Sequence, residues 1–132
     1  ELTIGESDKA SLQKYADNLT KIYTSYTSSI SKVEKGSLGV TPDYYHFAGS
    51  ASSIYLETVE KLRSMTVPAV LAQAHLGLLN AYLTTGTSLK SVSKANEDAA
   101  FAFSGLLSVS ESTKDEKRWL GEIKTILNSN GI

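Results

Sequence analysis

Two histidines, His46 and His75, carry the most versatile side-chain chemistry in this sequence. An imidazole titrates near neutral pH, binds metals and acts as a general base, so its neighbours decide its role. His75 recurs in register with the apolar residues of its segment, and Asn80 and Tyr82 follow within two helical turns. The three side chains predict a small-ligand site inside a helical fold. The alternative is structural: the ring nitrogens of His75 hydrogen-bond a carbonyl or hydroxyl group of a neighbouring helix.

The second histidine lies three residues after Asp43, so Asp43 and His46 share one face of a helix. Helical bundles that hold two metal ions combine carboxylates and histidines at this spacing on several helices. Here the position three before the other histidine is an alanine, and Glu57 and Glu60 lie several turns away from Asp43. We therefore expect no metal site and no cofactor.

An acyl-transfer enzyme of the Ser-x-x-Lys type needs one such pair together with an oxyanion hole and companion motifs. The spacing occurs three times in this serine-rich chain, at Ser11 with Lys14, Ser29 with Lys32 and Ser91 with Lys94. Three copies on polar helix faces are what chance produces, so we expect no catalytic residues and no enzyme.

Aromatic residues gather where the second helix begins, at Tyr44, Tyr45 and His46. Tyrosine is enriched in protein interfaces because it adds a large contact area and a hydroxyl group at low entropic cost. The sequence therefore predicts an interaction patch for a protein partner there. The alternative is that part of the cluster covers the end of the helices while the rest faces solvent.

Net charge limits the class of partner. The chain has 13 Lys and Arg against 14 Asp and Glu, interspersed along its length, and no cysteine. A nucleic-acid-binding surface would need a basic stripe, so we expect no nucleic acid as a partner. Disulfides and thiolate metal sites are excluded.

Apolar residues at intervals of three and four predict four helices. The first covers about residues 7–35 with Ser7 as its N-cap, and the second runs from Thr41-Pro42 to about Met65. The third restarts after Thr66-Val67-Pro68, and the fourth begins after a cap at residues 96–98. The fourth helix either breaks near Ser112, where residues 113–116 match a capping box, or continues with a solvent-facing waist.

These elements predict an all-α fold in which residues 1–132 form one up-down-up-down antiparallel four-helix bundle. No alternation of period two indicates a strand anywhere in the chain. Residues 66–89 contain no charged side chain, but polar residues interrupt the run. We therefore expect a helix surrounded by its neighbours rather than a membrane span.

Residues 67–80 carry a pattern of Val67-Pro68, then His75-Leu76, then Leu78-Leu79-Asn80. This pattern resembles a family of bacterial proteins from candidate phyla with small genomes, which have helical domains outside the cytoplasmic membrane and no assigned activity. Where that family usually has an aspartate-proline pair before the last helix, this chain has Asn96-Glu97-Asp98. The resemblance implies an extracytoplasmic location, with a membrane anchor outside the given sequence.

These observations favour a non-catalytic helical module for protein interaction or spacing. The alternative function is a small-ligand-binding bundle with its site around His75, Asn80 and Tyr82. A cavity beside His75 would favour ligand binding, whereas a filled core would weaken it.

Overall fold

The chain folds into helices, as a computed structural model describes for residues 1–36, 43–94 and 99–132. Side chains are described for residues 1–33, 46–94 and 104–132. Within these ranges the α-helices are α1 (Lys9–Gly36), α2 (Asp43–Arg63), α3 (Ala72–Ser93) and α4 (Ala99–Ser129). The predicted all-α class with four helices is confirmed. The turn expected after Gly36, the Thr41-Pro42 helix start and the cap at 96–98 lie outside the described residues.

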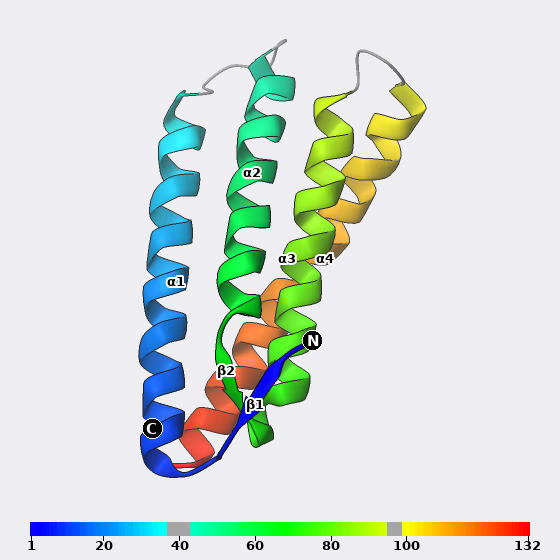
Figure 1. Ribbon diagram of the computed structural model, residues 1–132. Coiled ribbons are helices and arrows are strands. Elements are labelled where there is room, and N and C mark those ends of the chain that lie inside the picture. The colour runs from blue at the N-terminus through cyan, green and yellow to red at the C-terminus, as the bar shows by residue number, and fades with distance from the viewer. Residues whose placement is uncertain (37–42, 95–98) are drawn as a thin grey trace.

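The helices lie alongside one another as long rods, and α1 begins at the same end of the molecule at which α4 finishes (Figure 1). Helix α3 packs most extensively, against both α2 and α4, while α1 packs mainly against α2. Two glycines of α3 permit this close packing. A Cβ atom on Gly77 would clash with the indole ring of Trp119 in α4, and one on Gly86 would lie 2.9 Å from Leu56 in α2.

The core is a continuous cluster of apolar side chains from all four helices. It follows the predicted stripes because residues at intervals of three and four share one helix face. Its largest apolar members are almost completely buried: Leu12, Tyr15, Leu62, Leu71, Leu78, Tyr82 and Ile123. The apolar periodicity therefore identified the buried faces correctly along most of the chain.

The structure contains two short strands, so the prediction of a chain without strands is wrong. Strand β1 (Thr3–Gly5) pairs in parallel with β2 (Thr66–Pro68), and Ile4 lies opposite Val67. Three residues are too few to show an alternation of period two. After β2, a 3-10 turn, η1 (Ala69–Leu71), leads into α3, so the link between α2 and α3 is longer than predicted. The strands tie the N-terminal segment to this link.

The cap of α1 also differs from the prediction. The Asp8 Oδ1 atom accepts a hydrogen bond of 2.7 Å from the Ser11 backbone N–H, so Asp8 rather than Ser7 caps the helix. The Ser7 hydroxyl instead accepts a hydrogen bond of 3.1 Å from the Val70 backbone N–H in η1. This hydrogen bond holds the N-terminal segment next to the link that follows β2.

Helix α4 is continuous through Ser112, so the alternative of an unbroken helix is confirmed and the break there is wrong. The Thr113 hydroxyl donates to the Val109 carbonyl at 2.9 Å, a bond made inside a helix rather than at a cap. The waist faces solvent only in part: most of residues 110–118 are exposed, but Ser112 and Glu116 are buried. None of the helices in the described part of the chain is both long and apolar enough to cross a membrane.

We expect Leu78→Ala to lower the free energy of unfolding by roughly 2–5 kcal/mol, because it leaves a cavity in the core. Leu78 is 1% exposed, whereas Leu76, two residues before it, is 46% exposed. Leu76→Ala is therefore the matched control and should cost less than about 0.5 kcal/mol. Urea unfolding of the two variants measures both values, and equal losses would contradict the assigned face of α3.

Candidate functional site

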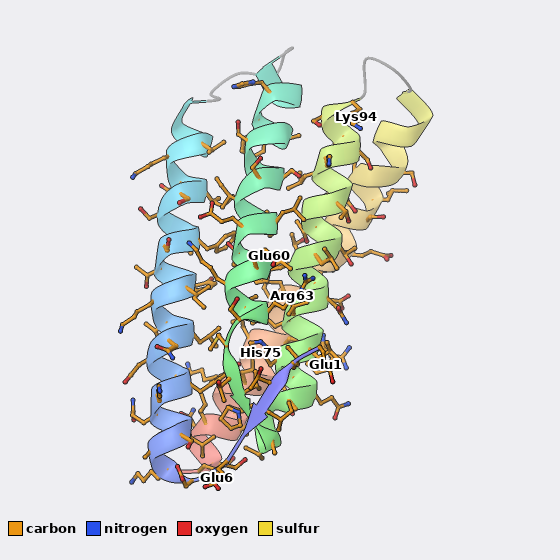
Figure 2. The ribbon with its side chains drawn as sticks, in the orientation of Figure 1. Glu1, Glu6, Glu60, Arg63, His75 and Lys94 are labelled. Carbon is orange, nitrogen blue, oxygen red and sulfur yellow. The ribbon has the colours of Figure 1, made fainter. Side chains whose placement is uncertain are left out.

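His75 lies inside the protein near the level of the two strands (Figure 2) and is 0% exposed. Its Nε2 atom is 2.9 Å from the Leu62 carbonyl oxygen in α2, and its Nδ1 atom is 2.9 Å from the Tyr15 hydroxyl in α1. A carbonyl oxygen can only accept, so Nε2 carries the proton and Nδ1 accepts from Tyr15. Both ring nitrogens are thus engaged within the core, as the structural alternative predicted.

Burial lowers the pKa of His75 below its usual value of 6.5, since the interior disfavours the charged ring, and the bond to Leu62 opposes this only in part. A neutral ring fits both hydrogen bonds without a counter-ion. The side chain therefore joins three helices, and its nitrogens are not available to a ligand in this arrangement.

A second polar group lies further along the interior and contains one residue from each helix. We call Tyr26, Tyr55, Tyr82 and Glu116 the tyrosine–glutamate cluster. The rings of Tyr26 and Tyr55, and those of Tyr26 and Tyr82, meet edge to face with centroids 5.1 Å apart. Edge-to-face contact places the positive ring edge against the negative face of the neighbour. The three rings thus form a compact aromatic group.

The hydroxyl groups of this cluster converge on the Glu116 carboxyl group. Tyr26 donates to the Tyr55 hydroxyl at 2.5 Å, and the side chains of Tyr82 and Tyr55 hydrogen-bond Glu116. Tyr55 can therefore accept from Tyr26 while it donates to Glu116. Glu116 is only 8% exposed, so its carboxyl group relies on these tyrosines rather than on water.

Burial raises the pKa of Glu116 above its usual value of 4.5, although the tyrosine hydrogen bonds and the nearby charge of Lys117 act in the opposite direction. Among the described side chains, the ion pairs are Glu57 with Lys61 and Glu60 with Arg63, and neither includes Glu116. A buried carboxyl group without a salt-bridge partner favours its protonated form. Glu116 is therefore harder to ionise than an exposed glutamate.

The cluster continues into a polar seam between α3 and α4. The Thr85 and Ser112 hydroxyls are 2.6 Å apart, and both side chains are buried. Thr85 also donates to the Ala81 carbonyl at 2.9 Å. Every buried side-chain nitrogen and oxygen in the described residues has a hydrogen-bond partner. The interior is thus polar in places, but its polar groups satisfy one another.

The sequence analysis missed Glu116 and Ser112 as interior residues. Glu116 precedes Leu120 by four residues and Ile123 by seven, so it lies in register with the apolar stripe of α4. Ser112 precedes Glu116 by four. This spacing could have placed both side chains inside, but charge favoured a solvent-facing reading. The capping-box match at residues 113–116 reinforced that reading.

The three residues predicted to form a ligand site do not converge. His75 and Tyr82 are buried, whereas Asn80 is exposed and lines a shallow groove between α3 and α4 beside Trp119. The cavity next to Tyr82 has a volume of only about 10 Å³ and is lined mostly by apolar side chains. A ligand pocket is usually some 300–1,000 Å³, so this cavity has no room for one.

Of the residues predicted for an interaction patch or considered for a metal site, the structure describes only some. His46 is exposed near the start of α2, and the side chains of Tyr44, Tyr45 and Asp43 lie outside the described set. Within the described residues, no three His, Asp or Glu side chains are grouped to hold a metal ion. The interaction patch therefore stays a prediction.

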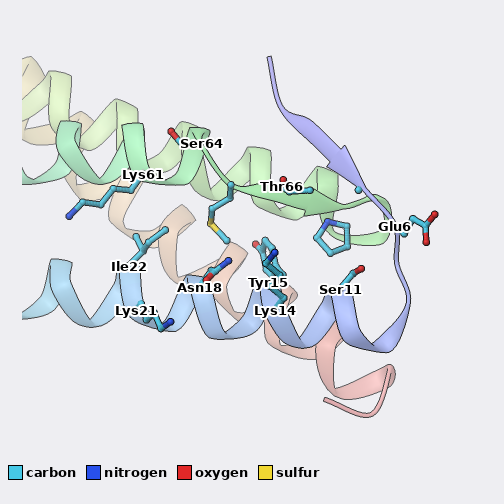
Figure 3. Close-up of a pocket in the computed structure, with 13 residues that line it drawn as sticks. Glu6, Ser11, Lys14, Tyr15, Asn18, Lys21, Ile22, Lys61, Ser64 and Thr66 are labelled. Atoms are coloured by element: carbon cyan, nitrogen blue, oxygen red, sulfur yellow. The ribbon is translucent and has the colours of Figure 1, made fainter.

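A surface groove lies between α1 and the end of α2, and the strands close one end of it (Figure 3). We call it the α1–α2 groove, and its volume is about 560 Å³. Lys14, Asn18 and Lys21 of α1 line one wall, and Lys61 of α2 and Ser64, just after that helix, line the other. Ser11 also lines it, and its backbone N–H donates to the Asp8 Oδ1 atom at the start of α1.

Comparison of the chain with protein families, curated proteins and solved structures found no match.

We expect Glu116→Gln to stabilise the protein at pH 7, because the amide keeps the shape and carries no charge. The native state holds the Glu116 proton more tightly than the unfolded chain, so native stability falls as pH rises from 4.5 through the raised pKa. The gain from the substitution should disappear below pH 4.5. Urea unfolding across pH measures it, with the exposed Glu122→Gln as control, and a variant less stable than wild type at pH 7 would contradict the assignment.

We expect Tyr15→Phe to cost roughly 1–3 kcal/mol of stability, since it leaves the buried Nδ1 atom of His75 without a donor. Tyr23→Phe is the matched control, because Tyr23 is 40% exposed, and it should cost less than about 0.5 kcal/mol. Thermal unfolding compares the two variants. If both cost the same, the hydrogen bond from Tyr15 to His75 is not a determinant of the fold.

Proposed function

We propose that this chain is a non-catalytic helical module that binds or spaces a partner protein outside the cytoplasmic membrane. In this proposal its helices form an up-down-up-down antiparallel bundle. The pattern at residues 67–80 supports membership of the extracytoplasmic bacterial family it resembles, with a membrane anchor outside the given sequence.

The observation that most supports the proposal is that His75 and Glu116, the reactive interior groups, form hydrogen bonds within the core. His75 uses both ring nitrogens, and the carboxyl group of Glu116 accepts from tyrosines. A catalytic or ligand-binding group must reach its substrate. Here these groups join helices instead, which supports a structural role for the polar core.

The dimensions support spacing. At about 1.5 Å per residue, the 28 residues of α1 and the 31 residues of α4 give rods of roughly 42 and 46 Å. Each rod packs against a neighbour along the core, and such packing resists bending. A rigid element of this length can hold two attached parts at a fixed separation.

The surface supports contact with a protein. Large apolar side chains are exposed at Ile4 in β1, Val70 in η1 and Leu76 in α3, with 51%, 45% and 46% of their area accessible. These residues belong to the part of the chain where the strands meet the start of α3. Two more large apolar side chains, Leu106 and Leu107, are exposed on α4. Binding of a partner that covers exposed apolar residues is favourable, because it removes their apolar surface from water.

Site-specific photo-crosslinking in the cells from which the gene comes tests this proposal. A photoreactive residue at Leu76 or Leu107 of the full gene product should form a discrete adduct with the same protein in repeated experiments. The same residue at the polar, exposed position Glu122 is the control. Absence of any protein adduct above this control, together with a small molecule retained in native mass spectra, would contradict the proposal in favour of ligand binding.

A further inference from the structure

The α1–α2 groove has a positively charged lining, although the whole chain has a net charge of −1. Three lysines, Lys14, Lys21 and Lys61, line it, against a single acid, Glu6. Lys61 pairs with Glu57 at 3.4 Å, but both side chains are largely exposed, so the pair is weak and can open. Lys14 and Lys21 form no ion pair within the described residues. The lining therefore has a net positive charge, carried mainly by Lys14 and Lys21.

The wall on α1 has an ordered spacing. Lys14, Asn18 and Lys21 follow one another at intervals of four and three, which places them in one row along the groove. The two lysines are seven residues apart, or roughly 10 Å along the helix axis. An extended peptide spans this distance with about three residues. The amide of Asn18 lies between the charges and can both donate to and accept from a peptide bond.

The floor of the groove is less polar than its walls. Tyr15, Ile22 and Met65 line it, and the strands close one end with Gly5, Thr66 and Pro68. The positively charged groups are lysines, whose ammonium groups act as point charges, and none is an arginine with the planar fork that binds one carboxylate or phosphate at two points. Spaced point charges above an apolar floor suit an extended acidic chain better than one compact anion.

We propose that the α1–α2 groove binds an acidic peptide segment of the partner protein, with carboxylates at Lys14 and Lys21 and its backbone beside Asn18. This rests on the proposed function, because it names the chemistry of the segment that the module recognises. Lys61 supplies a third charge from α2 when its pair with Glu57 opens. Charge complementarity of this kind mainly sets specificity and the rate of association.

Hexaglutamate is the probe, titrated at low salt into the isotope-labelled protein while backbone amide shifts are recorded. We expect shifts confined to residues 5–6, 11–22 and 61–68, which line the groove. The double variant Lys14→Gln/Lys21→Gln should weaken hexaglutamate binding roughly tenfold. The control, Lys114→Gln/Lys124→Gln, removes the same charge from exposed positions of α4 outside the groove and should change the affinity less than about twofold.

Three results would overturn the inference: no shifts at the groove, equal weakening by the two double variants, or citrate binding to the same amides as tightly as hexaglutamate at equal carboxylate concentration. The last would mean that the groove takes a small anion rather than a peptide. A protein adduct in the crosslinking experiment without hexaglutamate binding would refute only the groove assignment. Hexaglutamate binding without any protein adduct would refute the module's role in binding a partner.

Discussion

Glu116 imposes the strongest constraint on how the four helices fit together. An interior carboxyl group needs hydrogen-bond donors, and here they come from tyrosines on two other helices, while a third tyrosine supports Tyr55. Sliding any one helix by a turn would separate these hydroxyl groups from the carboxyl group or from one another. The cluster therefore selects one longitudinal register, whereas apolar stripes alone would tolerate several.

His75 acts in the same way at a second level of the interior, where it joins α3 to α1 and α2. The two sites respond to pH in opposite directions. His75 is held neutral, so its contribution is present above its usual pKa of 6.5 and is lost as pH falls below that value. Glu116 favours its protonated form, so its cost appears as pH rises above 4.5. Both sites set the arrangement of helices, and both carry a dependence on pH.

The sequence predicted the parts of the structure that arise from repeated local patterns. The four helices and most buried positions follow from apolar spacing, and the structural alternative for His75 follows from its place on an apolar stripe. The strands could not be predicted because three residues carry no periodicity. The cap at Asp8 was missed because Ser7 and Asp8 are both good caps, and only the contact of Ser7 with Val70 distinguishes them.

Glu116 was missed because a charged residue is rarely buried, and its tyrosine partners come from helices distant in sequence. Asn80, next to buried Leu79 in the sequence, proved to face outward.

The account depends most on Glu116 lying inside the protein with its carboxyl group held by tyrosines. Carbon-13 NMR of the glutamate side-chain carboxyl groups, followed across pH, tests this directly, and the resonance of Glu116 is assigned by its absence from Glu116→Gln. The account predicts that this resonance titrates clearly above pH 4.5. Titration at or below 4.5 would mean that the carboxyl group is solvated or paired with a cation, and would contradict the proposed core.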